Sequence, residues 1–305
     1  MLPHMGTSKW TADDIPDQAG RTVLVTGANS GLGLRASQAF AAKGAQVLMA
    51  CRNPAKAAAA LDDVKAVASA DAVVKTIALD LADLSSVHAA AEQVDGSVAA
   101  LDVLLNNAGI MAVPHGQTAD GFESQLGTNH LGHFALTGLL LPTLHRAPTP
   151  RVVTVSSGLH KIGKIRFDDL MGERHYNRWL AYGQTKLANL LFMHELGRRA
   201  SAAGSPLVSA AAHPGYASTH LQSAGGVAWA NRFFAQSDTA GAWPEEFAAT
   251  MPGVDSGDYY GPDGLFEQRG HPKKVKGNAR SRDAAAAARL WDVSVELTKV
   301  DPTFP

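Results

Sequence analysis

Cysteine is almost absent from this sequence. The 305 residues contain one, Cys51, so no disulfide can form within the chain, which fits a reducing compartment. Long apolar runs are missing as well. The best one, residues 134–141, falls short of the roughly 18 residues that a membrane-spanning helix needs, and Pro142 ends it. Residues 1–17 form a polar arm without the apolar core of a secretion signal. We therefore expect a cytoplasmic protein with no membrane partner.

The chain also has little net charge. The chain carries 27 Lys and Arg against 28 Asp and Glu, a formal net charge of −1. Such a balance gives no bulk attraction to nucleic acid or to an anionic membrane, so we expect no nucleic-acid partner. Apolar residues make up 46% of the chain and charged residues 18%, which is typical of a globular protein. We expect one large domain over residues 18–305, after the arm.

Apolar runs alternate with segments of helical pattern along most of the chain. This alternation is typical of βαβ units, and strands that are apolar throughout are buried on both faces. The sequence therefore predicts an α/β fold with a parallel sheet between two helix layers, which binds ligands beyond the carboxyl ends of its strands. The predicted strands are Thr22–Val25, Gln46–Cys51, Val73–Leu79, Leu101–Leu105, Arg151–Val155 and Leu207–Ala212.

A glycine-rich turn follows the first predicted strand. Gly27, Gly31 and Gly33 lie between the run Val23–Val25 and a helix-like stretch at 34–40. Glycines at such a turn let the backbone approach a pyrophosphate, and the helix N-terminus favours its negative charge. The spacing Gly-x-x-x-Gly-x-Gly differs from the commoner Gly-x-Gly-x-x-Gly. By itself it fits an ordinary turn as well as a dinucleotide site.

The second strand ends about twenty residues beyond the glycines, where a dinucleotide fold meets the adenosine ribose. An acidic residue there would bind both ribose hydroxyls and select NAD. This chain has Cys51 there, with Arg52 beside it. Because a guanidinium is a planar fork of donors suited to a 2′-phosphate, we predict NADP as the cofactor. The alternative is that Arg52 is an ordinary solvated arginine.

Polar residues also follow the third and fourth strands. Asp80 could accept a hydrogen bond from the adenine amino group or simply cap the next helix, and Asn106 could brace neighbouring strands. Further on, Asn129 is a poor residue for the interior of its predicted helix, which suggests a specific role. His130 and His133 have no carboxylate or cysteine to complete a ligand set, so we expect core or surface histidines and no metal.

Ser157 and the pair Tyr182 and Lys186 indicate catalysis. Ser157 closely follows a predicted strand, and Tyr182 opens a long helical stretch. Tyrosine and lysine four residues apart share a helix face, and a nearby ammonium stabilises phenolate. We therefore expect Lys186 to lower the pKa of Tyr182 towards a range in which it exchanges protons at neutral pH. Tyr-x-x-x-Lys is common by chance, but its position after a strand-end serine makes it more specific.

In kind and order, four motifs resemble those of the short-chain dehydrogenase/reductase family. They are Thr26–Gly33, Asn106–Gly109, Ser157 and Tyr182-x-x-x-Lys186. Three further stretches are similar to its retinol-dehydrogenase-like (WW-domain-oxidoreductase-like) branch, namely Cys51–Asn53, Ala181–Phe192 and His213–Thr219. The resemblance spans nearly the whole chain. It implies a single-domain, doubly wound Rossmann fold with seven strands in the order 3-2-1-4-5-6-7, the last at Asp258–Gly261.

The resemblance also implies the parts of the site. Tyr182 would be the general acid or base, Ser157 would hydrogen-bond the substrate oxygen, Lys186 would lower the tyrosine pKa and Asn129 would hold a water for proton relay. The residues predicted to bind the cofactor, the last three of them beside the nicotinamide, are Gly27, Asn29, Ser30, Gly31, Leu32, Gly33, Arg52, Asp80, Leu81, Asn107, Ala108, Gly109, Tyr182, Lys186, Pro214, Gly215 and Thr219.

Two departures from the family bear on the substrate. Ser157 and Tyr182 are 25 residues apart, more than is usual in the wider family, and the longer loop 158–180 should border the substrate. Membrane-bound retinol-active relatives carry an apolar N-terminal anchor that this sequence lacks. This difference argues against retinol itself as the substrate.

Aromatic residues lie in a predicted substrate lid around 216–257 and favour an apolar or aromatic substrate, although helix packing or a subunit contact explains them equally well. They are Trp229, Phe233, Phe234 and Trp243. A homo-oligomer, dimer or tetramer, is also predicted, because family members often pack the corresponding helix against a second subunit. The apolar positions concerned are Leu187, Leu190, Leu191 and Phe192.

The sequence thus predicts an oxidoreductase that transfers a hydride between NADP(H) and an alcohol or carbonyl substrate. The main alternative is a non-catalytic NADP-binding sensor or scaffold of the same fold, against which the presence of all four catalytic residues argues. A reductase of the chlorophyll-precursor type is a second alternative, but no residues suggest a tetrapyrrole site.

Overall fold

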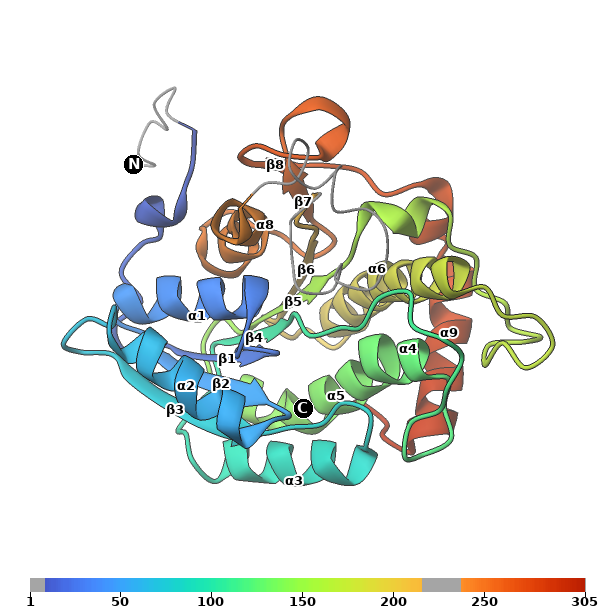
Figure 1. The fold of residues 1–305 in the computed structure, drawn as a ribbon, viewed down its shortest axis with the longest axis horizontal. Coiled ribbons are helices and arrows are strands. Elements are labelled where there is room, and N and C mark those ends of the chain that lie inside the picture. The colour runs from blue at the N-terminus through green and yellow to red at the C-terminus, as the bar shows by residue number, and fades with distance from the viewer. Residues whose placement is uncertain (1–8, 216–236, 305) are drawn as a thin grey trace.

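The computed structural model describes residues 9–215 and 237–304, which build one sheet between two layers of helices (Figure 1). The sheet order is β3-β2-β1-β4-β5-β6-β7-β8. The first seven strands are parallel and have the predicted order, whereas β8 pairs antiparallel with β7. The sequence missed β8 because its residues, Pro-Lys-Lys, contain no apolar run. The strands are β1 (Thr22–Thr26), β2 (Gln46–Cys51), β3 (Val73–Ala78), β4 (Val103–Asn106), β5 (Arg151–Val155), β6 (Val208–Ala212), β7 (Tyr259–Pro262) and β8 (Pro272–Lys274).

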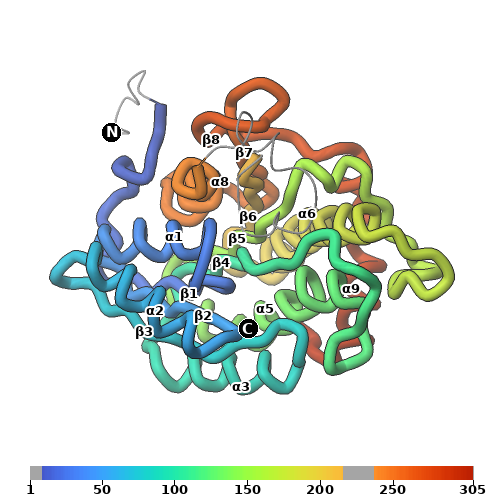
Figure 2. The backbone as a smooth tube through the Cα atoms, in the orientation of Figure 1, coloured from blue at the N-terminus to red at the C-terminus, as the bar shows by residue number. Residues whose placement is uncertain are grey.

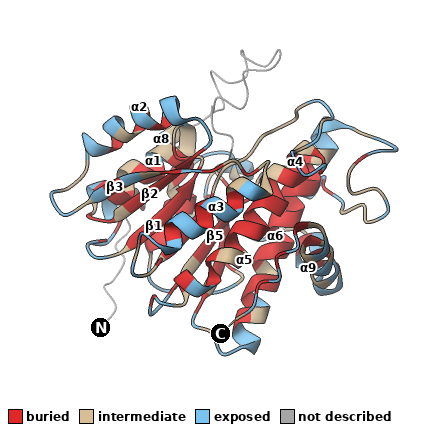
Figure 3. Cartoon of the chain, turned by 90° about the horizontal axis from the view of Figure 1, so that it is seen from below, coloured by how far each residue is buried: buried red, intermediate tan, exposed pale blue. Residues whose placement is uncertain are grey.

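Alternate residues of each central strand belong to different cores. Val23 and Val25 of β1 pack on the face covered by α1, α2 and α8, while Leu24 packs on the face covered by α3, α5 and α6. Both faces of the sheet are covered by helices and buried from solvent, which explains why the strands are apolar at nearly every position. Figure 3 shows buried residues through the sheet and along α5 and α6. The helices are α1 (Gly31–Ala42), α2 (Pro54–Lys65), α3 (Leu84–Asp95), α5 (Gly132–Leu144), α6 (Arg178–Ala202), α8 (Asp238–Thr250) and α9 (Ala284–Thr298).

The predicted N-terminal arm packs on the domain from Trp10 onward. Trp10 is 7% exposed, and its ring meets Phe247 of α8 edge-on at 5.2 Å. Ile15 is also buried. The arm therefore contributes to the helix layer that contains α8. None of the helices in the described part of the chain is long and apolar enough to cross a membrane.

The predicted lid divides into two parts. Residues 216–236, which include three of the four lid aromatics and Thr219, lie outside the described residues. From Asp238 on, the segment is α8, which packs against α1 and against strands β5, β6 and β7. Its aromatic residue, Trp243, stacks on His271 with ring centres 5.0 Å apart. This second part belongs to the scaffold and is not a separate cover over the site.

Helix α9 covers the face of α6 on which we based self-association. The backbone runs from α8 through β7 and β8 and then crosses to α9 on the far side of the sheet (Figure 2). Leu187 and Leu191 pack there against Ala287 and Leu290 of α9. The four α6 positions predicted to contact a second subunit, Leu187, Leu190, Leu191 and Phe192, are between 1% and 4% exposed. The structural reason for the oligomer prediction is therefore wrong, since the chain buries this face itself.

Candidate active site

A glycine-rich turn connects β1 to α1. Gly27 (φ 69°) and Gly31 (φ 52°) adopt the left-handed backbone region that favours glycine. A Cβ on Gly33 would lie 2.6 Å from the Gly27 carbonyl oxygen, so only glycine fits there. Ser30 is the N-cap of α1 but makes no side-chain capping bond within the described chain. Such a helix start, with N–H groups not used by a cap, suits a pyrophosphate. The turn contains all six predicted phosphate-side residues, Gly27, Asn29, Ser30, Gly31, Leu32 and Gly33.

Asn107, and not Asn106 as expected, ties the end of β4 to β1. Asn107 Nδ2 donates to the Thr26 carbonyl oxygen at 2.7 Å. The Thr26 hydroxyl accepts from the backbone N–H groups of Asn107 at 3.0 Å and Ala108 at 2.9 Å. Asn106 instead donates to Thr137 Oγ1 of α5. The bracing role of Thr26 was not predicted from the sequence. Its one local signal is a threonine that ends the strand directly before the first glycine.

Asn129 lies in a π-helical segment, η2 (Gly127–Leu131), between α4 (Ser124–Leu126) and α5, where we expected a regular helix. It is fully buried. Its Oδ1 accepts from the Ile110 N–H at 2.8 Å, and its Nδ2 donates to the Ile110 carbonyl at 2.9 Å and to Thr185 Oγ1 at 3.1 Å. π-bulges shift side chains out of the helical register and are frequent at functional sites. In this structure Asn129 joins the segment after β4 to α6.

Ser157, Tyr182 and Lys186 meet where β5 ends against α6. Ser157 is the N-cap of η3 (Gly158–Lys161), and its hydroxyl hydrogen-bonds with Tyr182. Tyr182 and Lys186 are 7% and 4% exposed. Lys186 Nζ donates to the Val155 carbonyl oxygen at 3.1 Å and lies 5.6 Å from the centre of the Tyr182 ring. The fold thus brings together side chains that are well separated in the sequence.

Burial dominates the pKa values of this pair. Burial raises the pKa of Tyr182 to about 12, and the hydrogen bond with Ser157 opposes this only in part. Burial lowers the pKa of Lys186 to about 8, against the charge of Glu245 in α8. The predicted shift of the Tyr182 pKa towards neutral pH is therefore wrong for this arrangement, because burial outweighs any effect of the lysine. Both groups lose water, and the ammonium donates to a backbone carbonyl and not to the phenol. Tyr182 is a neutral phenol at neutral pH.

The predicted ribose-binding position lies at the end of β2. Cys51 is 3% exposed, and burial raises the pKa of its thiol to about 11, so the sulfur is uncharged. Arg52 follows and is exposed. Asn53 then accepts from the Lys56 N–H at 3.0 Å and caps α2. No carboxylate occupies residues 51–53, and the one charged side chain there is the guanidinium.

Asp80 and Leu81 follow β3 and occupy different surroundings. Asp80 Oδ1 accepts from the Ala82 N–H at 2.9 Å. Asp83, which accepts from the Ser85 N–H, is the N-cap of α3, so the helix-capping alternative for Asp80 is wrong. Its carboxylate closes the preceding turn, and its contact with adenine stays a prediction. Leu81 is 6% exposed and packs in the core.

The end of β6 supplies the nicotinamide-side segment predicted from the sequence. His213, Pro214 and Gly215 follow β6 at the same edge of the sheet as the ends of β1, β4 and β5. Gly215 has a φ of 68°, and a Cβ there would collide with the Gln268 carbonyl oxygen. Thr219, the third predicted residue, lies outside the described residues. A glycine is thus required where the chain leaves the sheet.

A cavity of about 340 Å³ lies beneath the loop that connects Ser157 to Tyr182. Leu180 and Gln184 of α6 line it, and at 3.6 residues per turn both face the opposite side of the helix from Tyr182. Gln184 is already engaged, because its Oε1 accepts from the Arg166 N–H at 2.9 Å. The loop that we expected to border the substrate therefore also encloses a space behind α6.

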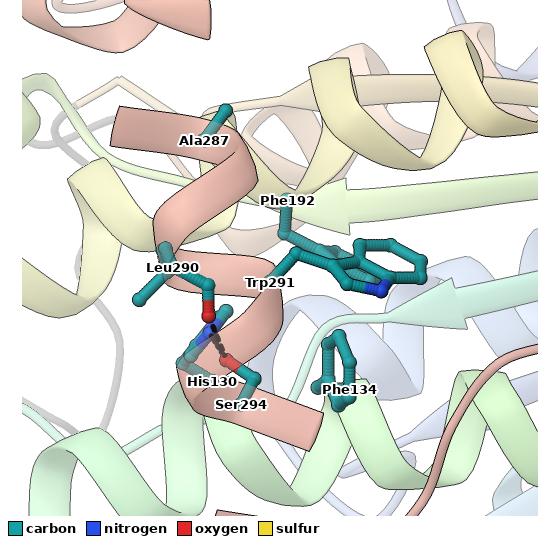
Figure 4. A pocket seen from close by; sticks show the side chains of 7 residues that line it. All are labelled: His130, Phe134, Phe192, Ala287, Leu290, Trp291 and Ser294. Atoms are coloured by element: carbon teal, nitrogen blue, oxygen red, sulfur yellow. Dashed lines mark hydrogen bonds between the residues drawn. The ribbon is translucent and has the colours of Figure 1, made fainter. Parts of the chain in front are cut away.

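His130 and His133 are core histidines, as predicted. His130 Nε2 bonds with Ser294 Oγ at 3.0 Å in a tightly filled pocket beside Trp291 of α9 (Figure 4). His133 Nε2 bonds with Thr26 Oγ1 at 2.9 Å. Burial lowers the pKa of His130 to about 4 and that of His133 to about 3, so both rings are neutral at neutral pH. Within the described residues, no group of three His, Cys, Asp or Glu side chains could hold a metal ion.

Comparison with known proteins gives the family. The family model for short chain dehydrogenases matches residues 21–226. Human retinol dehydrogenase 12 is 39% identical, and human retinol dehydrogenase 11 is 38% identical, over alignments that cover 91% of this chain and 86% of either protein. These relatives agree with the predicted retinol-dehydrogenase-like branch.

Two solved structures share the fold of this chain. The crystal structure of an uncharacterized protein from Mycobacterium paratuberculosis is 46% identical, has a TM-score of 0.81 and covers 97% of this chain and 100% of its own. A short chain dehydrogenase from Burkholderia cenocepacia, 23% identical over 77% of this chain and 93% of its own, shares the fold with a TM-score of 0.62. The chain belongs to the short-chain dehydrogenase family.

Proposed function

We propose that the chain transfers a hydride between NADP(H) and an apolar or aromatic alcohol or carbonyl compound. The observation that carries this proposal is the convergence of four polar side chains, two of which, Asn129 and Lys186, lie beside Gly109. A Cβ on Gly109 would lie 3.1 Å from Asn129 Oδ1 and 3.6 Å from Lys186 Nζ. Tyr182 lies beside Lys186, and its hydroxyl is hydrogen-bonded to Ser157. The set combines a proton donor, a hydrogen-bonding hydroxyl and a cation at one strand edge.

The described residues fit a dinucleotide. Gly27 and Gly33 pack so closely that side chains at these positions would fill the turn at the start of α1. Arg52 gives the ribose end a positive charge, and Gly109 keeps the space next to Lys186 open. The Burkholderia cenocepacia dehydrogenase of this fold is described in complex with NADP, which supports the choice of cofactor. When bound, the nicotinamide supplies or accepts the hydride.

Tyr182 acts as the acid in the reductive direction. Its pKa of about 12 keeps the proton on the hydroxyl at neutral pH, ready for donation to a carbonyl oxygen. Ser157 hydrogen-bonds the same hydroxyl and donates to the substrate oxygen during transfer. Lys186 is mostly charged below its pKa of about 8 and stabilises the phenolate that proton donation leaves. Asn129 fixes the segment around Ile110 and holds the relay water in this proposal.

An exposed aromatic side chain just before Tyr182 supports an apolar substrate. Trp179, in the first turn of α6, is 44% exposed and lies three residues before Tyr182, on the same face of the helix. A large apolar side chain at the surface near a site is typical of ligand-binding regions. The retinol dehydrogenases among the relatives are named for an apolar alcohol, which agrees with this choice.

A substrate panel tests the proposal. Purified protein with NADPH is given aromatic and long-chain aldehydes, retinaldehyde among them, together with 2-oxo acids of matched length as charged controls. Burial of about 100 Å² of apolar surface contributes roughly 2.5 kcal/mol, so we expect kcat/KM to favour the apolar members by on the order of 50-fold. The nicotinamide absorbance reports turnover. Activity confined to carboxylated or phosphorylated carbonyls would contradict the proposed substrate class.

A further inference from the structure

A partly buried contact joins the end of β6 to the loop between β7 and β8. His213 is 2% exposed, and its Nε2 lies 3.4 Å from Glu267 Oε2. The same carboxylate oxygen lies 3.4 Å from Lys161 Nζ, in the segment that follows Ser157. Glu267 thus contacts both chain segments that border the proposed nicotinamide and substrate positions. No motif in the sequence indicates a role for Glu267 or Lys161.

The hydrogen bonds of His213 define its tautomer. The Gly215 N–H donates to His213 Nδ1 at 3.2 Å, so Nδ1 carries a lone pair. In the neutral ring the proton is then on Nε2, which faces Glu267. Contact with His213 holds the pKa of Glu267 at about 2, so the carboxylate is ionised at neutral pH. A continuous polar chain therefore runs from Glu267 through the imidazole to the backbone of Gly215.

The backbone around this chain is held in uncommon conformations. Phe266 and Glu267 have φ values of 54° and 57°, in the left-handed region that non-glycine residues rarely adopt. Opposite them, a Cβ on Gly261 would overlap the His213 ring, and a Cβ on Gly215 would meet the Gln268 carbonyl. The loop between β7 and β8 and the segment after β6 therefore pack so closely that neither Gly261 nor Gly215 could carry a side chain. Conformations of this kind persist where their surroundings fix them and are concentrated at functional sites.

Two further titratable groups face His213, and neither replaces Glu267. The Tyr259 ring of β7 lies 5.2 Å from the His213 ring. His160 lies 5.8 Å from Tyr259, ring to ring, and its Nδ1 bonds to the Ser157 carbonyl at 2.7 Å. In this cluster Glu267 provides the carboxylate that the His213 Nε2 proton faces.

We propose that Glu267 is a positioning residue that orients His213 and, through it, fixes the Pro214-Gly215 backbone against the nicotinamide half of the cofactor. This inference rests on the proposed function. It makes a specific distinction, because Glu267 acts at the nicotinamide end and Arg52 at the ribose-phosphate end. Loss of Glu267 should therefore weaken both nicotinamide cofactors equally and leave a ligand without nicotinamide unaffected.

The test is titration with NADPH, NADH and 2′,5′-ADP, which lacks the nicotinamide half. Glu267→Ala should raise the dissociation constants of NADPH and NADH by the same factor, on the order of tenfold, and leave that of 2′,5′-ADP unchanged. Glu267→Gln keeps an oxygen at the same position facing His213 Nε2 and should recover most of the affinity. Lys161→Ala removes only the half-exposed partner of Glu267 and is the matched control, expected within about twofold of wild type.

The outcomes distinguish failure of the positioning role from failure of the proposed function. An unchanged NADPH constant in Glu267→Ala, or an equal loss for 2′,5′-ADP, overturns the positioning role, because the second result indicates general damage to the fold. A loss in Glu267→Gln as large as in Glu267→Ala overturns it too, since orientation by an acceptor would then not be the cause. Wild-type protein that binds neither NADPH nor 2′,5′-ADP would instead contradict the proposed function on which the inference rests.

Discussion

Tyr182→Phe should lower kcat by about 10²–10⁴-fold, the typical contribution of a positioned general acid. The substitution removes one hydroxyl from a ring that is 7% exposed, so the ring's packing persists and only the proton donor is lost. The dissociation constant of NADPH should change by no more than about twofold, because Tyr182 contributes little to ground-state binding in this mechanism. Steady-state kinetics on a substrate from the panel, with a cofactor titration beside it, measures both effects.

Tyr260→Phe is the matched control. It also removes a buried phenolic hydroxyl, one that donates to Asp258 Oδ2 at 2.9 Å on the face of the sheet that carries α8. We expect this variant to keep its kcat and lose only some stability, on the order of 1 kcal/mol. A Tyr182→Phe enzyme with most of its activity, or equal losses in the two variants, would show that the Tyr182 hydroxyl is not the proton donor.

Arg52→Ala should raise the dissociation constant of NADPH by about ten- to a hundredfold, since charge-assisted hydrogen bonds contribute on the order of 1.5–3 kcal/mol. The constant of NADH should stay nearly unchanged, because NADH has no 2′-phosphate. Cys51, which precedes Arg52, is a neutral, buried thiol and provides no negatively charged acceptor for the ribose hydroxyls. Fluorescence titration of wild type and variant with both cofactors gives the four constants.

Lys56→Ala controls for the loss of a positive charge near the same strand end. Lys56 is exposed in the first turn of α2, four residues beyond Arg52. A general electrostatic effect would weaken NADPH binding similarly in both variants, whereas a specific fork to the 2′-phosphate requires Arg52 alone. Equal losses of NADPH and NADH in Arg52→Ala, or a wild-type preference for NADH, would overturn the NADP assignment.

The parts of this protein that the sequence predicted best depend on local patterns. Uninterrupted apolar runs indicated the buried strands, and together with the family resemblance they gave the order of seven strands that the sheet shows. The turn at Gly27 and the serine that follows β5 were found in the same way, because glycine and strand-end polar residues are informative within a few positions of themselves.

The features that the sequence did not reveal depend on contacts between distant segments. Nothing in the α6 sequence shows that α9, about a hundred residues later, covers Leu187 and Leu191. Asn106 and Asn107 are chemically identical neighbours, and only the direction of each side chain decides which one reaches Thr26. The pKa of Tyr182 escaped prediction for a related reason, since spacing gives the partner but not the extent of burial.

Glu267 shows the same limit at the level of function. Its neighbours in sequence, from Leu265 to Gln268, contain no motif, and its contact with His213 joins positions 54 residues apart. A glutamate in an exposed loop would ordinarily be assigned to the solvated surface. Its contact to a buried imidazole becomes visible only when β6 and the loop after β7 are placed side by side.

The central claim is that the chain is an enzyme that moves a hydride, and not a sensor that merely binds NADP. Isotope transfer tests it most directly. Two samples of NADPH are prepared, each deuterated at C4 of the nicotinamide on one of its two faces. Each sample is incubated with the protein and the best carbonyl substrate, and the product is analysed by mass spectrometry. The account predicts one deuterium on the former carbonyl carbon from one labelled face, and none with Tyr182→Phe over the same time. Tight binding of NADPH without label in any product would contradict it.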